Sequence, residues 1–149
     1  MKILIALMAG IFALTAFRDT HINQPVRDNS IDSNNLPLQN TRWKLVELGG
    51  KKVPANATSK PMYLILKSDS TITGNGGCNA FSGTYSTGKN NEIIFGEVVR
   101  TNILCPGIDF EKAYLDAIAK TDRYQIVGNE LLLQNKLTTL AKFTGNDKQ

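Results

Sequence analysis

The sequence has little of what most catalytic sites are built from. Its 149 residues include one histidine, two cysteines and one tryptophan, and the histidine, His21, lies in a polar stretch near the N-terminus. A Ser-His or Cys-His nucleophile pair therefore has no base in the rest of the chain. Carboxylates alone remain as candidates, and because charged side chains are mostly solvated we expect surface positions for Glu47, Glu92, Glu97 and Glu111. We predict no enzymatic activity and no catalytic, cofactor-binding or metal-binding residues.

The excess of positive over negative charge is small. The formal net charge is +4, and Lys51 and Lys52 are the only adjacent basic pair. A nucleic-acid-binding domain normally carries a basic stripe with interleaved aromatic residues or a recognisable module. The sequence has neither, so we expect no nucleic-acid partner.

One long apolar run is present, and it lies at the N-terminus. Lys2 precedes an apolar stretch that ends at Phe17 after several small residues, a pattern typical of a secretory signal peptide over residues 1–17. The run is shorter than the roughly 20 residues that span a bilayer, and no cysteine follows it to carry a lipid. We therefore expect export to the periplasm, the cell envelope or the medium, with membrane attachment only if the segment stays uncleaved.

The rest of the chain divides by composition into three parts. Residues 18–38 are polar with scattered aliphatics, which predicts a disordered leader, and residues 145–149 predict a flexible tail. One domain remains over residues 39–144.

Short runs rich in β-branched and aromatic residues recur through this domain. They predict strands at Thr41–Leu48, Met62–Lys67, Ser70–Gly74, Ala80–Tyr85, Glu92–Phe95, Val98–Asn102, Arg123–Val127, Glu130–Gln134 and Thr138–Phe143. Residues 49–50, 68–69, 88–91 and 128–129 have the composition of hairpin turns. Helical spacing over residues 108–120 predicts one amphipathic helix, with Asp109 as its cap, that plugs a barrel. We thus predict a β-rich α+β fold, a small antiparallel barrel-like domain of about eight strands.

The two cysteines, Cys78 and Cys105, favour a disulfide, because the count is even and the expected compartment is oxidising. Two buried free thiols are the alternative. A CxxC redox pair is absent, and two distant cysteines without a histidine do not complete a zinc site.

Cys78 lies inside a glycine-rich block, GNGGCNAFSGTY, at residues 74–85. We call this segment the glycine block. A phosphate loop needs a following Lys-Ser/Thr and a helix, and here a strand follows. We instead expect a structural corner, in which Gly74, Gly76 and Gly77 adopt positive φ and allow close backbone approach. Asn79 would anchor this corner through backbone groups, and Gly83 would ease a bend in the next strand.

Four other residues could contribute to a site. Trp43 and Tyr85 are either core residues or the lining of a ligand pocket, and for Trp43 we favour the core. Arg100 and Thr101 are either surface residues or a buttress for the glycine corner, and the sequence does not decide between these.

Residues 38–143 resemble the META/HslJ family in the order of their motifs. The resemblance rests on TRWKLVELGGKKV, GNGGCNAFSGTY, RTNILCP and the closing ELLLQNKLTTLAKF. Its motif positions in this chain are Gly74, Gly76, Gly77, Asn79, Phe81, Gly83, Tyr85 and Pro106. The family implies a small β-rich domain with one helix, paired cysteines, an envelope location, and a link to heat shock and novobiocin tolerance. It implies no established activity.

The chain departs from the family pattern at two points. Asn102 and Ile103 stand where the family often has Arg and Met, and the lipid-bearing cysteine of many relatives is missing. We expect an exported, non-enzymatic envelope protein in stress tolerance or protein interaction. The alternative is a carrier of a small apolar ligand or lipid inside the barrel, for which the run from Met62 to Leu66 is the motivation.

Overall fold

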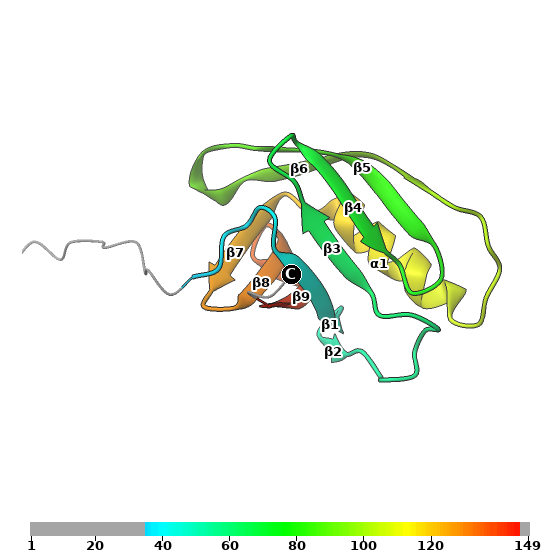
Figure 1. Ribbon diagram of the computed structural model, residues 1–149. Coiled ribbons are helices and arrows are strands. Elements are labelled where there is room, and N and C mark those ends of the chain that lie inside the picture. Colours follow the sequence, from blue (N-terminus) through cyan, green and yellow to red (C-terminus); the bar gives the residue numbers. More distant parts are fainter. Residues whose placement is uncertain (1–34, 147–149) are drawn as a thin grey trace, which may run out of the picture. The chain divides into compact units, whose positions relative to one another are not determined.

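The computed structural model describes residues 35–146, in which nine strands form a single antiparallel sheet (Figure 1). The predicted signal peptide, and most of the predicted leader, lie outside the described residues. The strands are β1 Arg42–Leu48, β2 Lys51–Lys52, β3 Tyr63–Leu66, β4 Thr71–Asn75, β5 Ala80–Thr87, β6 Ile93–Arg100, β7 Arg123–Val127, β8 Glu130–Asn135 and β9 Thr138–Asn146. A 3₁₀ turn, η1 (Lys89–Asn91), and one helix, α1 (Ile108–Lys120), complete the domain.

The sheet curls until its two outer strands meet at one point. The strand order is β6-β5-β4-β3-β1-β9-β8-β7, and β2 pairs with β1. At the start of β6, Glu92 bridges Arg123, and the N–H of Ile93 donates to the carbonyl of Asp122 at 3.1 Å. The fold is therefore a half-barrel of the β-rich α+β class that the sequence predicts.

All four predicted turn segments connect antiparallel neighbours. Residues 49–50, 68–69, 88–91 and 128–129 join β1 to β2, β3 to β4, β5 to β6 and β7 to β8. In the second turn, Asp69 Oδ1 accepts hydrogen bonds from Oγ1 of Thr71 at 2.6 Å and from its N–H at 3.0 Å. These bonds hold the pKa of Asp69 below its ordinary value.

Two strand predictions need correction. The runs Glu92–Phe95 and Val98–Asn102 form the single strand β6, because its pairing with β5 continues across a bulge in which Gly96 and Glu97 lie opposite the single residue Thr84. The two-residue strand β2 was not expected, since exposed lysines carry no strand pattern.

The helix has the predicted bounds, but its N-cap is a different residue from the one predicted. Its N-cap is Gly107, at φ 86°, and the carbonyl of Gly107 accepts the N–H groups of Phe110 and Glu111. Asp109 therefore lies inside the first turn, where its charge complements the helix dipole, and is not the cap. Within residues 35–146 no helix is long and apolar enough to cross a membrane.

The core lies between the concave side of the sheet and α1. The helix packs against β1, β6, β8 and β9 and contributes the fully buried side chains of Tyr114 and Ile118. The buried apolar residues outside the helix are Met62, which directly precedes β3, and the strand residues Trp43, Leu45, Leu64, Leu66, Ile72, Phe81, Tyr85, Ile93, Phe95, Leu131, Leu133, Ala141 and Phe143. Side chains thus occupy the interior, where the carrier hypothesis places an apolar ligand.

The domain extends beyond the expected limits of 39 and 144. The indole N–H of Trp43 donates to the carbonyl of Leu38 at 3.0 Å, and the N–H of Leu36 donates to the carbonyl of Gly128 at 2.9 Å. At the other end β9 runs to Asn146, and a Cβ added at Gly145 would lie 2.7 Å from Leu36. Residues 35–38 and 145–146 therefore belong to the domain, because each terminal segment packs against the other.

Candidate functional site

The predicted disulfide between Cys78 and Cys105 is present, with 6.0 Å between the two Cα atoms. It links the β4–β5 connection to the segment between β6 and α1. With a sequence separation of 27 residues, it stabilises the fold by about 3.5 kcal/mol in the chain-entropy model. We call this bond, together with residues 76–79, the loop 101–107 and Glu111, the disulfide corner.

Asn79, which is 1% exposed, is the residue through which the corner holds its loop. Its Oδ1 accepts hydrogen bonds from Thr101 Oγ1 and from the N–H of Ile103, both at 2.7 Å. Its Nδ2 donates to the carbonyl of Ile103 at 3.0 Å and to Oε1 of Glu111 at 2.9 Å. All four hydrogen-bonding positions of the amide are used, so the loop is fixed independently of the disulfide.

The prediction for Glu111 was wrong. We expected a solvated surface position, but the residue is 1% exposed. Its Oε2 accepts the N–H groups of Asn79 at 2.6 Å and Cys78 at 3.3 Å. Its Oε1 accepts Asn79 Nδ2 and, at 3.2 Å, Nη1 of Arg100. Four donors, one of them the cation Arg100, offset the cost of burying this charge. Arg100 thus buttresses the corner, which was the alternative that the sequence left open.

The glycines of the block mainly allow other side chains and backbone atoms to lie close to their Cα atoms. Of the three that were expected at positive φ, only Gly77 has it, at 101°, and a Cβ there would collide with the side chain of Thr58. A Cβ at Gly76 would lie 2.5 Å from Cγ of Glu111, and one at Gly74 would collide with the ring of Phe81. At Gly83 an added Cβ would lie 2.7 Å from the carbonyl oxygen of Glu97, beside the β5 register shift.

The aromatic candidates lie in the core. Trp43 is fully buried, and Phe81 packs edge-on against Tyr114 with ring centroids 5.9 Å apart. The hydroxyl of Tyr85 donates to the carbonyl of Lys67 and accepts from Gln39 Nε2, both at 2.7 Å.

The remaining candidates are scattered. Glu92 and Glu97 are exposed and Glu47 is partly exposed, and none of them hydrogen-bonds to Glu111 among the contacts of residues 35–146. Pro106 is exposed and precedes the helix cap.

The corner presents an exposed apolar tip. Leu104 is 88% exposed and Ile103 is 56% exposed. Asn79 holds the main chain of Ile103, and Leu104 lies between Ile103 and Cys105. Val99, on the adjoining strand, is 58% exposed. The tip is therefore a constrained apolar projection.

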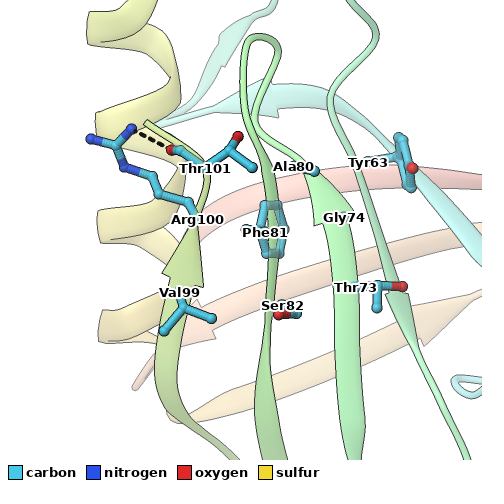
Figure 2. A pocket seen from close by; sticks show the side chains of 9 residues that line it. All are labelled: Tyr63, Thr73, Gly74, Ala80, Phe81, Ser82, Val99, Arg100 and Thr101. Atoms are coloured by element: carbon cyan, nitrogen blue, oxygen red, sulfur yellow. Dashed lines mark hydrogen bonds between the residues drawn. The ribbon is translucent and has the colours of Figure 1, made fainter. Parts of the chain in front are cut away.

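A pocket of about 470 Å³ lies over strands β3 to β6, next to the corner (Figure 2). Figure 2 shows that the guanidinium of Arg100 turns toward α1, where it bonds the carbonyl of Thr101 at 3.2 Å. The other lining groups are hydroxyls, small side chains and rings, from Tyr63, Thr73, Gly74, Ala80, Phe81, Ser82 and Val99. This lining offers hydrogen bonds and apolar contact but pairs no acid with a base. Within residues 35–146 no group of three or more His, Cys, Asp or Glu is placed to hold a metal ion.

The burial of Glu111 had a signal in the sequence. Glu111, Tyr114 and Ile118 are spaced by three and four residues, which places all three on one helix face, and all three are buried. The contact of Thr58 with Gly77 has no comparable signal, because it joins two irregular segments.

The comparison with known families decides the identity of this fold. The META domain model matches residues 36–147. The chain belongs to the META domain family. A solved NMR structure of a protein from Burkholderia xenovorans is similar, with 26% identity and a TM-score of 0.58 over 74% of this chain and 85% of that one.

A crystal structure of a DUF4847 family protein from Bacteroides vulgatus shares the fold at 20% identity. Its TM-score is 0.52, over 72% of this chain and 94% of that one. No protein in the curated set matches. The META domain assignment confirms the family indicated by the glycine block and RTNILCP, and the disulfide is compatible with an oxidising, exported location.

Proposed function

We propose that this META domain protein is exported to the cell envelope, is not an enzyme, and acts in stress tolerance by binding another protein through the apolar tip of the disulfide corner. The observation that carries the proposal is Leu104, which is 88% exposed although its neighbours are held by Asn79 and by the disulfide. Because the main chain on both sides of Leu104 is already held, binding there orders little additional backbone, so the tip is suited to recognition.

The chemistry of the corner supports a structural role for its charged groups. The carboxylate of Glu111 accepts four hydrogen bonds, two of them from Asn79 and one from Arg100. A general base needs a free lone pair directed at a substrate, and this carboxylate is 1% exposed. Export is supported by the signal-like N-terminal sequence and by the disulfide.

Site-specific photo-crosslinking in the native host tests the proposal. A photoreactive residue replaces Leu104 in one variant, and Leu137 in a matched control. Leu137 is 94% exposed and lies in the β8–β9 turn, away from the disulfide corner in sequence. We expect a discrete protein adduct from position 104 and none of the same mass from position 137.

A genetic readout accompanies the crosslink. Leu104→Ser should fail to restore heat tolerance to a deletion strain, whereas Leu137→Ser should restore it at the same envelope abundance. Equal adducts from both positions, or full rescue by Leu104→Ser, would refute a role for the tip.

A further inference from the structure

A second surface feature, separate from the apolar tip, is a pocket with one sign of charge. It has a volume of about 430 Å³ and lies between β1, β2 and the connection that leads to β3. Lys44, Lys52 and Lys60 line it together with the hydroxyl-bearing Thr58 and Ser59, and none of its lining residues is acidic. The three lysines are 8 residues apart in each step along the chain, so only the fold brings them together.

These lysines are not neutralised by ion pairs. Within residues 35–146 the two salt bridges join Arg100 to Glu111 and Lys142 to Glu130. Glu47 lies opposite Lys52 in the pairing of β1 with β2, but it does not line the pocket and forms no salt bridge among the described residues. A concave surface of one charge concentrates counter-ions.

The loop that carries Lys60 is fixed by the disulfide corner. The N–H of Lys60 donates to the carbonyl of Gly77 at 3.0 Å, and Thr58 Oγ1 donates to the carbonyl of Lys60 at 2.8 Å. Side chains at Gly77 and Gly107 would collide with Thr58 and with the carbonyl of Ala57. The two glycines therefore let this loop pack closely on the corner, which holds one wall of the pocket in place.

The opposite wall is equally well defined. The N–H of Leu45 donates to the carbonyl of Met62 at 3.0 Å, and the N–H of Val53 donates to the carbonyl of Val46 at 2.9 Å. The lysines are exposed, whereas Leu45 and Met62 are buried at the base. The pocket is therefore lined both by buried apolar residues and by three exposed lysines.

We propose that this pocket binds a phosphate group. Lysine ammonium groups act as point charges for phosphate, and the neighbouring hydroxyls add hydrogen-bond donors, whereas planar recognition of a carboxylate favours arginine. The phosphate belongs either to a small soluble compound or to a lipid headgroup. The inference is independent of the proposed role of Leu104, because it uses other residues and another readout.

The test is a titration of the full-length protein with inorganic phosphate, followed by amide chemical shifts. Sodium chloride at matched ionic strength is the control. We expect saturable shifts at Thr58, Ser59 and Lys60 with phosphate alone. The triple variant Lys44→Gln, Lys52→Gln, Lys60→Gln should bind phosphate roughly tenfold more weakly. Its matched control, Lys67→Gln, Lys89→Gln, Lys112→Gln, has the same net charge and should bind within about twofold of the wild type.

A second arm distinguishes the source of the phosphate. If the protein sediments with phosphatidylglycerol vesicles but not with phosphatidylcholine vesicles, and if this requires the pocket lysines, the phosphate belongs to a lipid headgroup. If phosphate causes shifts but the protein does not sediment with vesicles, the phosphate belongs to a soluble compound. The proposal is overturned if neither probe binds, if the shifts do not saturate, or if both triple variants weaken binding equally.

Discussion

Asn79 and Glu111 meet at two points, although 32 residues separate them in the chain. The carboxylate of Glu111 accepts a hydrogen bond from the backbone N–H of Asn79 at 2.6 Å and another from its side-chain amide at 2.9 Å. The same amide holds both main-chain groups of Ile103. A single buried contact therefore joins α1, the glycine block and the exposed loop.

Replacing this carboxylate by an amide should destabilise the domain strongly. Glu111→Gln turns one acceptor into a donor that faces other donors, and it leaves Arg100 without its charge partner. We expect a loss of about 3 kcal/mol in the free energy of unfolding, measured by urea denaturation without reductant. The exposed Glu97→Gln is the control and should change it by less than about 0.5 kcal/mol. Equal stabilities of the two variants would show that the Glu111 network contributes nothing.

Gly76 should be coupled to Glu111. Because a Cβ at Gly76 would lie 2.5 Å from Cγ of Glu111, we expect Gly76→Ala to cost about 2 kcal/mol in the wild-type background. In a Glu111→Ala background the obstructing side chain is gone, and the cost should fall below about 1 kcal/mol. A double-mutant cycle from urea unfolding measures the difference. Additive costs would mean that Gly76 is needed for another reason.

The disulfide should stabilise the fold without being needed for the position of the loop. The double variant Cys78→Ala, Cys105→Ala should lose about 3.5 kcal/mol of unfolding free energy. The amide of Ile103 should stay protected from hydrogen exchange in the native state, because its acceptor is Asn79 Oδ1. In Asn79→Ala with the disulfide intact, that protection should be lost. Loss of protection in the cysteine variant instead would assign the loop position to the disulfide.

Tyr114 carries a hydroxyl that is buried without a hydrogen-bond partner within residues 35–146. Burial raises the pKa of Tyr114 well above its ordinary value of 10.0. Tyr114→Phe removes this desolvated group, so we expect the free energy of unfolding to stay level or to rise by about 1 kcal/mol. The control is Tyr85→Phe, which removes a hydroxyl with two partners and should cost about 1 kcal/mol.

The same tyrosine predicts a dependence of stability on alkaline pH. With its pKa raised in the folded state, Tyr114 keeps its proton above pH 10.0, while the unfolded chain loses it. Unfolding thus becomes more favourable as pH rises through that range, and Tyr114→Phe should lose less stability there than the wild type. Urea midpoints on both sides of pH 10 measure the difference. An identical alkaline loss in both proteins would contradict the prediction.

Local patterns predicted most of the elements. The helix over residues 108–120 has the predicted bounds, because its apolar spacing is set by one period, and four hairpin turns follow from turn-forming residues. The division of β6 into two strands failed because Gly96 and Glu97 interrupt the apolar pattern, whereas pairing with β5 continues across them. Asp109 was predicted as the cap because aspartate often caps helices through its side chain. The helix begins instead after Gly107, which has a positive φ and makes no side-chain capping bond.

The sequence by itself determined the β-rich fold class and the META domain family, because these depend on periodicity and on short motifs. It favoured the pairing of the two cysteines through their even count, and the structure showed the bond. Only the tertiary structure decided which groups of Cys78, Asn79 and Arg100 surround the carboxylate of Glu111, and that Lys44, Lys52 and Lys60 share one pocket. Whether a charged side chain is solvated or enclosed depends on which distant segments pack around it. That packing is set here by contacts such as Thr58 on Gly77, between segments with no periodic pattern of their own.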